Sequence, residues 1–309
     1  MDWYGKIRVE FIISMNNKKI FDQQKYLEII KNNFKDKIDD FQILSGDDGS
    51  ETYGNIVFMI NRKWIFRFSR KDIDIRQLEI EKSFLKQFHK ISPIPVPEIL
   101  YEDKDFMGCK MFSGEPFTKE ICDALSAQEQ EAIWKSIGEF LQILHSMDYH
   151  HKNLVEYPLG DNKFWHDLWA PIEYQISSAT RKKALDYFEK YFAEEAKNPT
   201  QNTICHGDFH PNHILFDKSS KTIIGIIDFG RLCINDPAVD FNLIERFFGS
   251  DAIEKVLQFY KKDVASNFRE RITFQNRRRL FAAFFHAKSV NQTSSFSRYL
   301  ERIEDAFSD

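Results

Sequence analysis

The first third of the chain carries the alternating and β-rich hydrophobic pattern of strands. The runs Asn55–Ile60 (NIVFMI) and Lys63–Phe68 (KWIFRF) predict two strands, because both are rich in β-branched and aromatic residues. They are joined by a short turn at Asn61–Arg62. A helical spacing of apolar residues follows from about Ile75 to Phe88. This part of the chain is therefore expected to be a sheet with one helix.

The predicted secondary structure changes from strands to helices near Ser113–Gly114. Before this point, three prolines in SPIPVPEIL require an extended segment, and FMGCKMF predicts one more strand. After it, Ser126 and Glu129 have the spacing of a capping box in front of an apolar helical stripe that includes Trp134. Lys182–Ala196 is a second amphipathic helix. One β island, TICHGDFHPNHILFD and TIIGIIDFG, interrupts the helices. We expect an α+β fold with a β-rich lobe over 1–113 and a helical lobe over 114–309.

Composition narrows the class of protein. Hydrophobic residues make up 42% of the chain and charged residues 29%, and the net charge is −4, which argues against nucleic acid as a partner. The four cysteines form no C-x-x-C pair, so we expect no zinc site and a reducing compartment. No stretch has the length of a membrane span or the pattern of a signal peptide. A cytoplasmic monomer without membrane association is expected.

The chemistry is concentrated in the β island, in His206-Gly-Asp208 and Ile227-Asp228-Phe-Gly230. Phosphoryl transfer needs a carboxylate directed at the acceptor hydroxyl and ligands for the ion that neutralises the phosphates. Asp208 suits the first role and Asp228, 20 residues later, the second. We expect the two acids to lie on adjacent, hairpin-linked strands. The alternative is that Asp208 caps a turn and His206 is a packed core histidine.

The segment HGDFHPNHILFD…GIIDFGRLCINDPAVDF resembles the catalytic core of the aminoglycoside phosphotransferases, relatives of the protein kinases. The likeness extends upstream through SGDDGSETYGNIVFMINRKWIFRFSRK, SPIPVPEIL, GEPFT and SIGEFLQILHSMDY, and is strongest to the 2''-phosphotransferases. It covers about Phe41 to Asp240. It implies a bilobal, protein-kinase-like fold that binds ATP or GTP with Mg²⁺ in an interlobe cleft and phosphorylates a small hydroxylated molecule.

The resemblance assigns a role to each residue of the catalytic core. Asp208 is the implied base and Asp228 the implied Mg²⁺ ligand. His213 stands at a second metal-ligand position that is usually Asn, as in some 2''-enzymes and in macrolide phosphotransferases. Because imidazole nitrogen suits Mn²⁺ better than Mg²⁺, Mn²⁺ is expected to be tolerated.

The resemblance also implies nucleotide contacts in the first lobe. The segment Ser45–Ser50 corresponds to the loop over the nucleotide, with Ser50 as a contact. Lys110 and Phe112 lie in the implied hinge. Arg67 stands where most relatives have a phosphate-binding Lys, and Glu81 is its expected partner, with Glu79 as the fallback.

The acceptor is the least determined feature. The resemblance implies an aminoglycoside held by carboxylates, for which the sequence offers Glu245 and Asp251, but Arg246 and Arg231 add positive charge. A macrolide 2'-phosphotransferase is the alternative, favoured by Arg67, His213 and the Phe-rich tail. A second alternative is a pseudokinase that binds nucleotide without turnover.

Three further features are interpreted as structural. Asp236 and Asp240 are expected to tie loops together in the core. Trp134 is expected in the core as well. The run Arg277-Arg278-Arg279 is expected to form a solvated helix face.

Overall fold

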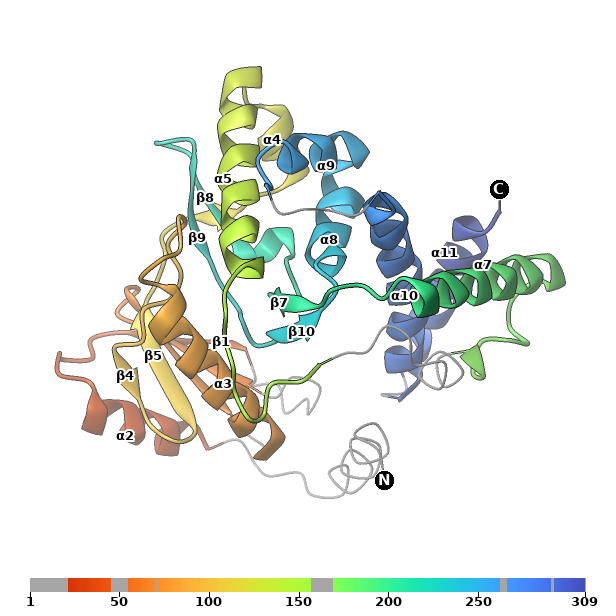
Figure 1. The fold of residues 1–309 in the computed structure, drawn as a ribbon. Coiled ribbons are helices and arrows are strands. Elements are labelled where there is room, and N and C mark those ends of the chain that lie inside the picture. The colour runs from red at the N-terminus through yellow and green to blue at the C-terminus, as the bar shows by residue number, and fades with distance from the viewer. Residues whose placement is uncertain are drawn as a thin grey trace. The chain divides into compact units, whose positions relative to one another are not determined.

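The computed structural model describes residues 22–45, 55–69, 72–156, 169–261, 266–289 and 292–308 (Figure 1). The chain forms two compact units, and the boundary between them passes through a helix. The first unit comprises Met1–Lys86 and Pro97–Phe112, and the second comprises Gln87–Val96 and Ser113–Asp309. No helix of the described residues is long and apolar enough to cross a membrane.

The first unit is built on a five-stranded antiparallel sheet. Its strand order is β1-β2-β3-β5-β4, so β5 lies between β3 and β4. The elements are α2 (Gln23–Asn33), β1 (Phe41–Ser45), β2 (Asn55–Ile60), β3 (Trp64–Ser69), α3 (Asp72–Phe88), β4 (Tyr101–Glu102) and β5 (Phe106–Lys110). The two strands and the helix that the hydrophobic pattern predicted are present, and α3 begins three residues earlier than expected.

Alternation in β2 and β3 places one set of side chains in the core of this unit. Ile56, Phe58 and Ile60 of β2 are buried, with Phe66 and Phe68 of β3. They pack against Leu27 and Ile30 on one face of α2 and against Phe34 directly after it. In the three-residue connection between the strands, Asn61 and Arg62 have φ of 52° and 53°, and the amide of Lys63 donates to the carbonyl of Ile60. The left-handed conformation of both residues matches the twist of the hairpin.

The second unit is mainly helical. Its elements are β6 (Glu115–Pro116), α4 (Lys119–Asp123), α5 (Ala127–His145), α7 (Ser178–Lys197), β7 (Thr203–Cys205), the 3₁₀ turn η1 (Pro211–His213), β8 (Ile214–Asp217), β9 (Thr222–Ile226), β10 (Cys233–Asn235), α8 (Ala238–Phe248), α9 (Ser250–Leu257), α10 (Phe268–Ser289), the 3₁₀ turn η2 (Thr293–Ser295) and α11 (Phe296–Ala306). Strands β6, β8 and β9 form one small sheet, and β7 pairs with β10 in another.

Helix α5 begins with the predicted capping box. Ser126 accepts a hydrogen bond from the amide of Glu129, and the Glu129 side chain accepts one from the amide of Ser126. Trp134 is 2% exposed, which confirms its place in the core. Gly138 faces α9 so closely that a Cβ there would lie 2.7 Å from the Val256 carbonyl oxygen. Glycine therefore permits the close packing of α5 on α9.

The small sheets are connected to their surroundings by backbone hydrogen bonds. The amide of Ile226, at the end of β9, donates to the carbonyl of Pro95 in the extended proline segment. The amide of Ile227 donates to the carbonyl of His213. A separate aromatic core joins α7, α10 and α11 through Phe188, Phe281 and Phe307. The end of β9, which leads to Asp228, is thus anchored on both sides.

Candidate active site

The loop after β7 positions Asp208. Strand β7 ends at Cys205, and Gly207 then adopts a φ of 78°, a conformation that side chains rarely adopt. A Cβ at Gly207 would lie only 2.2 Å from the carbonyl oxygen of Arg231. Glycine is therefore required for the close approach of this loop to the segment after β9, and Asp208 is delivered beside that segment.

His206 links the two loops that carry the candidate acids. Its ring is fully buried, its Nδ1 lies 3.3 Å from the amide of Asp208, and its Nε2 lies 3.1 Å from the carbonyl oxygen of Ile227. The amide can only donate and the carbonyl can only accept, so the ring is neutral and carries its proton on Nε2. Burial lowers the pKa of His206, in agreement with this neutral form. His206 is a packed core histidine and also holds both loops in register.

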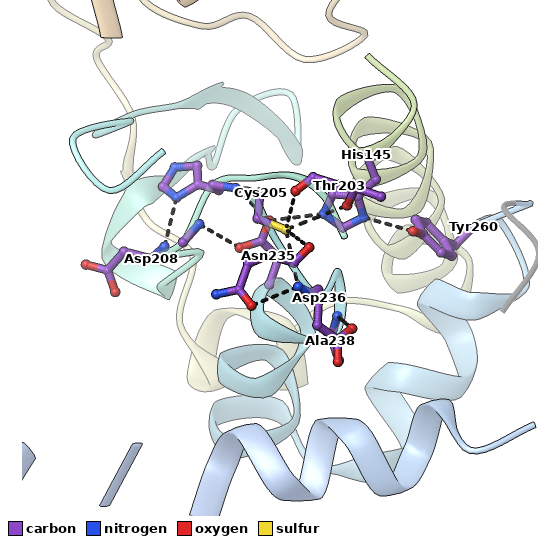
Figure 2. A network of polar contacts seen from close by, with 11 residues as sticks. His145, Thr203, Cys205, Asp208, Asn235, Asp236, Ala238 and Tyr260 are labelled. Atoms are coloured by element: carbon purple, nitrogen blue, oxygen red, sulfur yellow. Dashed lines mark hydrogen bonds and ion pairs between the residues drawn. The ribbon is translucent and has the colours of Figure 1, made fainter. Parts of the chain in front are cut away.

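Asp240 fixes the same loop from the first turn of α8. Its Oδ2 accepts from the amide of His206 at 2.7 Å, and its Oδ1 accepts from the amide of Gly207 at 2.8 Å. The Oδ2 also lies 3.1 Å from Nε2 of His145 on α5, whose Nδ1 lies 2.9 Å from the hydroxyl of Tyr260. Figure 2 shows the resulting network between Tyr260 and the loop, with the carboxylate of Asp208 pointing away from it. The expectation that Asp240 is structural is confirmed.

Asp236 is structural as well. Its Oδ1 accepts from the amide of Ala238 at 2.9 Å, next to the start of α8. Burial raises the pKa of Asp236, and the nearby Arg271, 3.4 Å away at Nε, partly offsets that effect. The side chain thus anchors the segment that leads into α8, as the sequence predicted.

His145, Cys205 and Asp240 form the one group of three potential metal ligands found among the described residues, with ligand atoms within 4.8 Å of one another. All three side chains are buried and have protein partners: Cys205 donates to the carbonyl oxygen of Asn235 at 3.4 Å. Since the amides of His206 and Gly207 occupy the carboxylate of Asp240, this cluster acts as a hydrogen-bond network that supports the loop.

His213 and Asp228 come together at the end of β9. His213 closes the turn η1, and its Nδ1 lies 2.9 Å from the carbonyl oxygen of Asp208. That bond assigns the proton to Nδ1 and leaves the lone pair of Nε2 available, 3.5 Å from Oδ2 of Asp228. Asp228 has a φ of 65° and its side chain is 48% exposed. The strained backbone presents this carboxylate to solvent instead of to the core.

This pair fits a divalent cation. A neutral imidazole nitrogen and a carboxylate oxygen are typical ligands of such ions, and a second hydrogen bond that fixes the imidazole is the usual support. The Asp208 carbonyl supplies that support here. A bound Mg²⁺ would be held by His213 and Asp228 and would neutralise charge on the phosphates.

The prediction that the two acids lie on adjacent, hairpin-linked strands is wrong. Asp208 and Asp228 do not lie on hairpin-linked strands: the hairpin is β8–β9, whereas Asp208 follows β7, which pairs with β10. Pro211 lacks an amide hydrogen and begins a 3₁₀ turn, so it separates Asp208 from β8. The two acids are related through His206 and His213 instead.

Arg279 is the site residue that the sequence analysis missed. On α10, its Nη2 donates to Oδ1 of Asp208 at 3.1 Å. Burial acts to raise the pKa of Asp208, but the positive charges of Arg279 and Arg231 and the hydrogen bond from Arg279 act against it, and the pKa lies below its ordinary value. A carboxylate with a lowered pKa is ionised at neutral pH and able to accept a proton.

The expectation that Arg277–Arg279 forms a solvated face is therefore wrong. The Arg277 guanidinium packs over Tyr187 and Phe307, at 4.3 and 4.6 Å from the ring centroids. Arg278 donates to Gln275 at 3.2 Å. All three arginines are partly buried, because α10 is enclosed by α8 and by the aromatic core with α7 and α11.

The predicted partner of Arg67 is confirmed in the first unit. Arg67 on β3 forms a two-pronged ion pair with Glu81 on α3, with Nη1 3.1 Å from Oε1 and Nη2 in contact with Oε2. The side chain of Glu81 is 1% exposed and that of Arg67 is 11% exposed. A forked guanidinium–carboxylate pair of this kind sets the orientation of both groups.

The remaining predicted residues have diverse positions. Lys110 is the exposed last residue of β5, and Phe112, two residues on, is half-buried. Ser50 lies outside the described residues. Glu245 on α8 is half-buried and accepts a hydrogen bond from Asn276. Asp251 is exposed in the first turn of α9.

Two units, one with a five-stranded sheet and an Arg–Glu pair and one with a histidine-linked pair of acids, define a kinase-like fold. The sequence profile of the phosphotransferase enzyme family matches residues 52–271, and the chain belongs to this family. The structure resembles the GDP and kanamycin complex of APH(2'')-IIIa with a TM-score of 0.80 at 18% identity, over 92% of this chain and 98% of the other. It also resembles the macrolide 2'-phosphotransferase MphH from Brachybacterium faecium, with a TM-score of 0.66 at 16% identity, over 93% and 97%.

Similarity to curated proteins is local. The uncharacterised protein YcbJ of Bacillus subtilis is 33% identical over 73 residues, which are 24% of each chain. Acyl-CoA dehydrogenase family member 11 of Rattus norvegicus is 23% identical over 181 residues, 56% of this chain and 23% of that protein. The alignments thus span about a quarter of the length of these relatives.

Proposed function

We propose that this protein transfers the γ-phosphate of ATP or GTP to a hydroxyl group of a small molecule, with Asp208 as the base. The observation that carries the proposal is the linkage of Asp208 to His213 and Asp228. The Asp208 carbonyl orients His213 toward Asp228, and the Asp208 amide is held by His206, which also binds the strand leading to Asp228. One hydrogen-bonded unit therefore carries the candidate base and the candidate metal ligands.

In the proposed reaction, the acceptor oxygen forms a bond to the γ-phosphorus while the bond from that phosphorus to the bridging oxygen of the nucleotide breaks. The proton of the acceptor hydroxyl passes to the carboxylate of Asp208, and the nucleoside diphosphate leaves. The lowered pKa of Asp208 supports an ionised base. Arg67, oriented by Glu81, would position the phosphates, and the proposed donor contacts also include Ser50, Lys110 and Phe112.

Aminoglycosides are the acceptors that the resemblance favours, and macrolides are the alternative. One structural neighbour is a complex with GDP and kanamycin, and another is a complex with ATP and streptomycin. In this chain, Glu245 and Asp251 would be the carboxylates for such an amine. The pseudokinase alternative has less support, because Asp208, His213 and Asp228 are all present and arranged together. The four cysteines are free and buried, which supports a reducing cytoplasm as the proposed compartment.

The proposal is tested with purified protein, ATP and GTP, and a panel of aminoglycosides, macrolides and simple hydroxylated molecules. Replacement Asp208→Asn should lower kcat by at least ~10²-fold, as expected for the loss of a general base, while nucleotide binding remains. Turnover equal to wild type in this variant would contradict the assignment. Nucleotide binding without any transfer in wild type would favour the pseudokinase.

A further inference from the structure

Positive charge surrounds the candidate base. Arg279 donates directly to the carboxylate of Asp208, and Arg231, three residues after Asp228, also acts on that carboxylate. The backbone of Arg231 lies against the loop that carries Asp208, because a Cβ built at Gly207 would lie 2.2 Å from the Arg231 carbonyl oxygen and 3.3 Å from the Arg231 Cβ. Two arginines, Arg279 of α10 and Arg231, therefore lie near Asp208.

Arg279 has donors to spare. Its side chain is 37% exposed, and only Nη2 is used, on a single oxygen of Asp208. Within the described residues, Nε and Nη1 of Arg279 have no hydrogen-bond partner, and Arg231 forms no ion pair. A guanidinium carries five N–H donors in a flat fork suited to carboxylates and phosphates. Most of this capacity is therefore open to a ligand that approaches Asp208.

Of the two carboxylates expected to hold a cationic acceptor, Glu245 is engaged elsewhere and Asp251 is exposed to solvent. Glu245 accepts from Asn276 of α10, and burial raises its pKa, with Arg269 and Asn276 opposing that effect. Asp251 lies exposed at the start of α9. Asp228 faces His213 as a candidate metal ligand. The charged group that α10 places against Asp208 is thus the guanidinium of Arg279, which is a cation.

We propose that the acceptor carries an anionic group, a carboxylate or a phosphate ester, near the hydroxyl that is phosphorylated, and that Arg279 with Arg231 binds it. This inference rests on the proposed function and names its acceptor class. An amine of a polycationic sugar placed beside two guanidinium groups would be repelled, whereas an anion would form charge-assisted hydrogen bonds. Since Arg279 also contacts Asp208, it would hold the acceptor hydroxyl next to the base.

The test measures binding separately from turnover. The wild-type protein labelled with ¹⁵N is titrated at constant ionic strength with glucose and three of its derivatives, and the side-chain Nε–H signals of the arginines are followed. Gluconate and glucose 6-phosphate are the anionic probes, glucose is neutral and glucosamine is cationic. The Arg279 signal is assigned from Arg279→Lys. Comparing the two anions distinguishes a carboxylate from a phosphate as the preferred group.

The expected result is that at least one anion shifts the Arg279 signal and binds about tenfold or more tightly than glucose or glucosamine. Arg279→Gln should lower that affinity about tenfold, and Arg279→Lys should lower it less. Arg298→Gln is the matched control, because Arg298 is an exposed arginine on α11, and it should leave the affinity unchanged.

Three outcomes overturn the inference: glucosamine binding as tightly as the anions, anion binding that survives Arg279→Gln, or no binding of either anion at millimolar concentrations. Nucleotide hydrolysis and phosphate transfer are measured in the same samples. If neither occurs in wild type, the proposed function fails, and the binding titration still decides the charge of the ligand at Arg279.

Discussion

At the residue scale, two arginines contact carboxylates in very different surroundings. Arg67 and Glu81 are enclosed, so their pairing is a permanent feature of the first unit. Arg279 and Asp208 are partly exposed, at 37% and 25%, so their pairing is open to exchange with a ligand. An arginine–carboxylate pair therefore serves for orientation in one place and is available for recognition in the other.

Removal of the Arg67 side chain should affect both stability and nucleotide use. Arg67→Ala leaves Glu81 buried without its cation, which costs about 3–5 kcal/mol in the free energy of unfolding. The nucleotide KM should rise and kcat should fall, whereas Arg67→Lys should recover much of the activity. Chemical denaturation and steady-state kinetics on the three proteins measure this. Wild-type kinetics in a folded Arg67→Ala protein would show that Arg67 does not position phosphate.

The imidazole of His213 should set the metal preference. Mg²⁺ prefers oxygen ligands, while Mn²⁺ accepts nitrogen more readily. We expect Mn²⁺ to support activity well relative to Mg²⁺, and His213→Asn to shift the preference toward Mg²⁺. Activity is measured across a concentration series of each ion for both proteins. Equal metal preference in the two would mean that His213 does not ligate the ion.

At the element scale, the loop between β7 and η1 owes its shape to a helix that comes later in the chain. Asp240, in the first turn of α8, accepts from two successive amides of the loop, and His145 of α5 contacts Asp240. The helices thereby act as a rigid support for the five-residue loop between Cys205 and Pro211. The geometry of Asp208 depends on this support.

Gly207 provides a sharp test of that geometry. Gly207→Ala would place a Cβ 2.2 Å from the Arg231 carbonyl oxygen, in addition to the cost of a positive φ, roughly 1–3 kcal/mol. Gly249→Ala is the matched control, because Gly249 has a φ of 90° and open space around its Cβ position. We expect Gly249→Ala to lose only the strain energy, and Gly207→Ala to lose more stability and most of the activity. Equal losses in both variants would show that the loop tolerates displacement from Arg231.

At the scale of the whole molecule, acid should destabilise the second unit through two carboxylates. Hydrogen bonds from Lys221 and from Ser126 lower the pKa of Glu129 from 4.5 to about 2, and hydrogen bonds from Ser219 and Ser220 lower that of Asp217 from 3.8 to about 2. A lowered pKa in the folded state means that the stabilisation is complete above the ordinary value. It is lost as the pH falls toward 2.

The melting temperature should therefore fall between about pH 4.5 and pH 2. Glu129→Gln should melt at a lower temperature near neutral pH and should show a shallower decline with acid. Thermal unfolding of both proteins across this range is the measurement. Parallel curves for wild type and variant would show that Glu129 does not contribute to the acid sensitivity.

Local pattern was enough to predict much of the fold and part of the site. The β2–β3 hairpin, helix α3, the capping box of α5 and the buried Trp134 all follow from side-chain period and turn chemistry within a few residues. The pairing of Arg67 with Glu81 and the place of His213 were predicted from the resemblance to the aminoglycoside phosphotransferases. Asp208 and Asp228 were found from two short motifs 20 residues apart.

Other features depend on residues far apart in the chain, and the sequence by itself determined only their identity. Arg279 lies 71 residues after Asp208, and no periodicity in the sequence indicates that the two side chains are in contact. The prediction that a hairpin links the strands of the two acids was wrong, because a 3₁₀ turn that begins with Pro211 connects Asp208 to β8. The charge beside the candidate base was decided by tertiary structure alone, since burial and electrostatics depend on which helix faces the loop. Sequence specified the candidate catalytic groups, and packing decided what surrounds them.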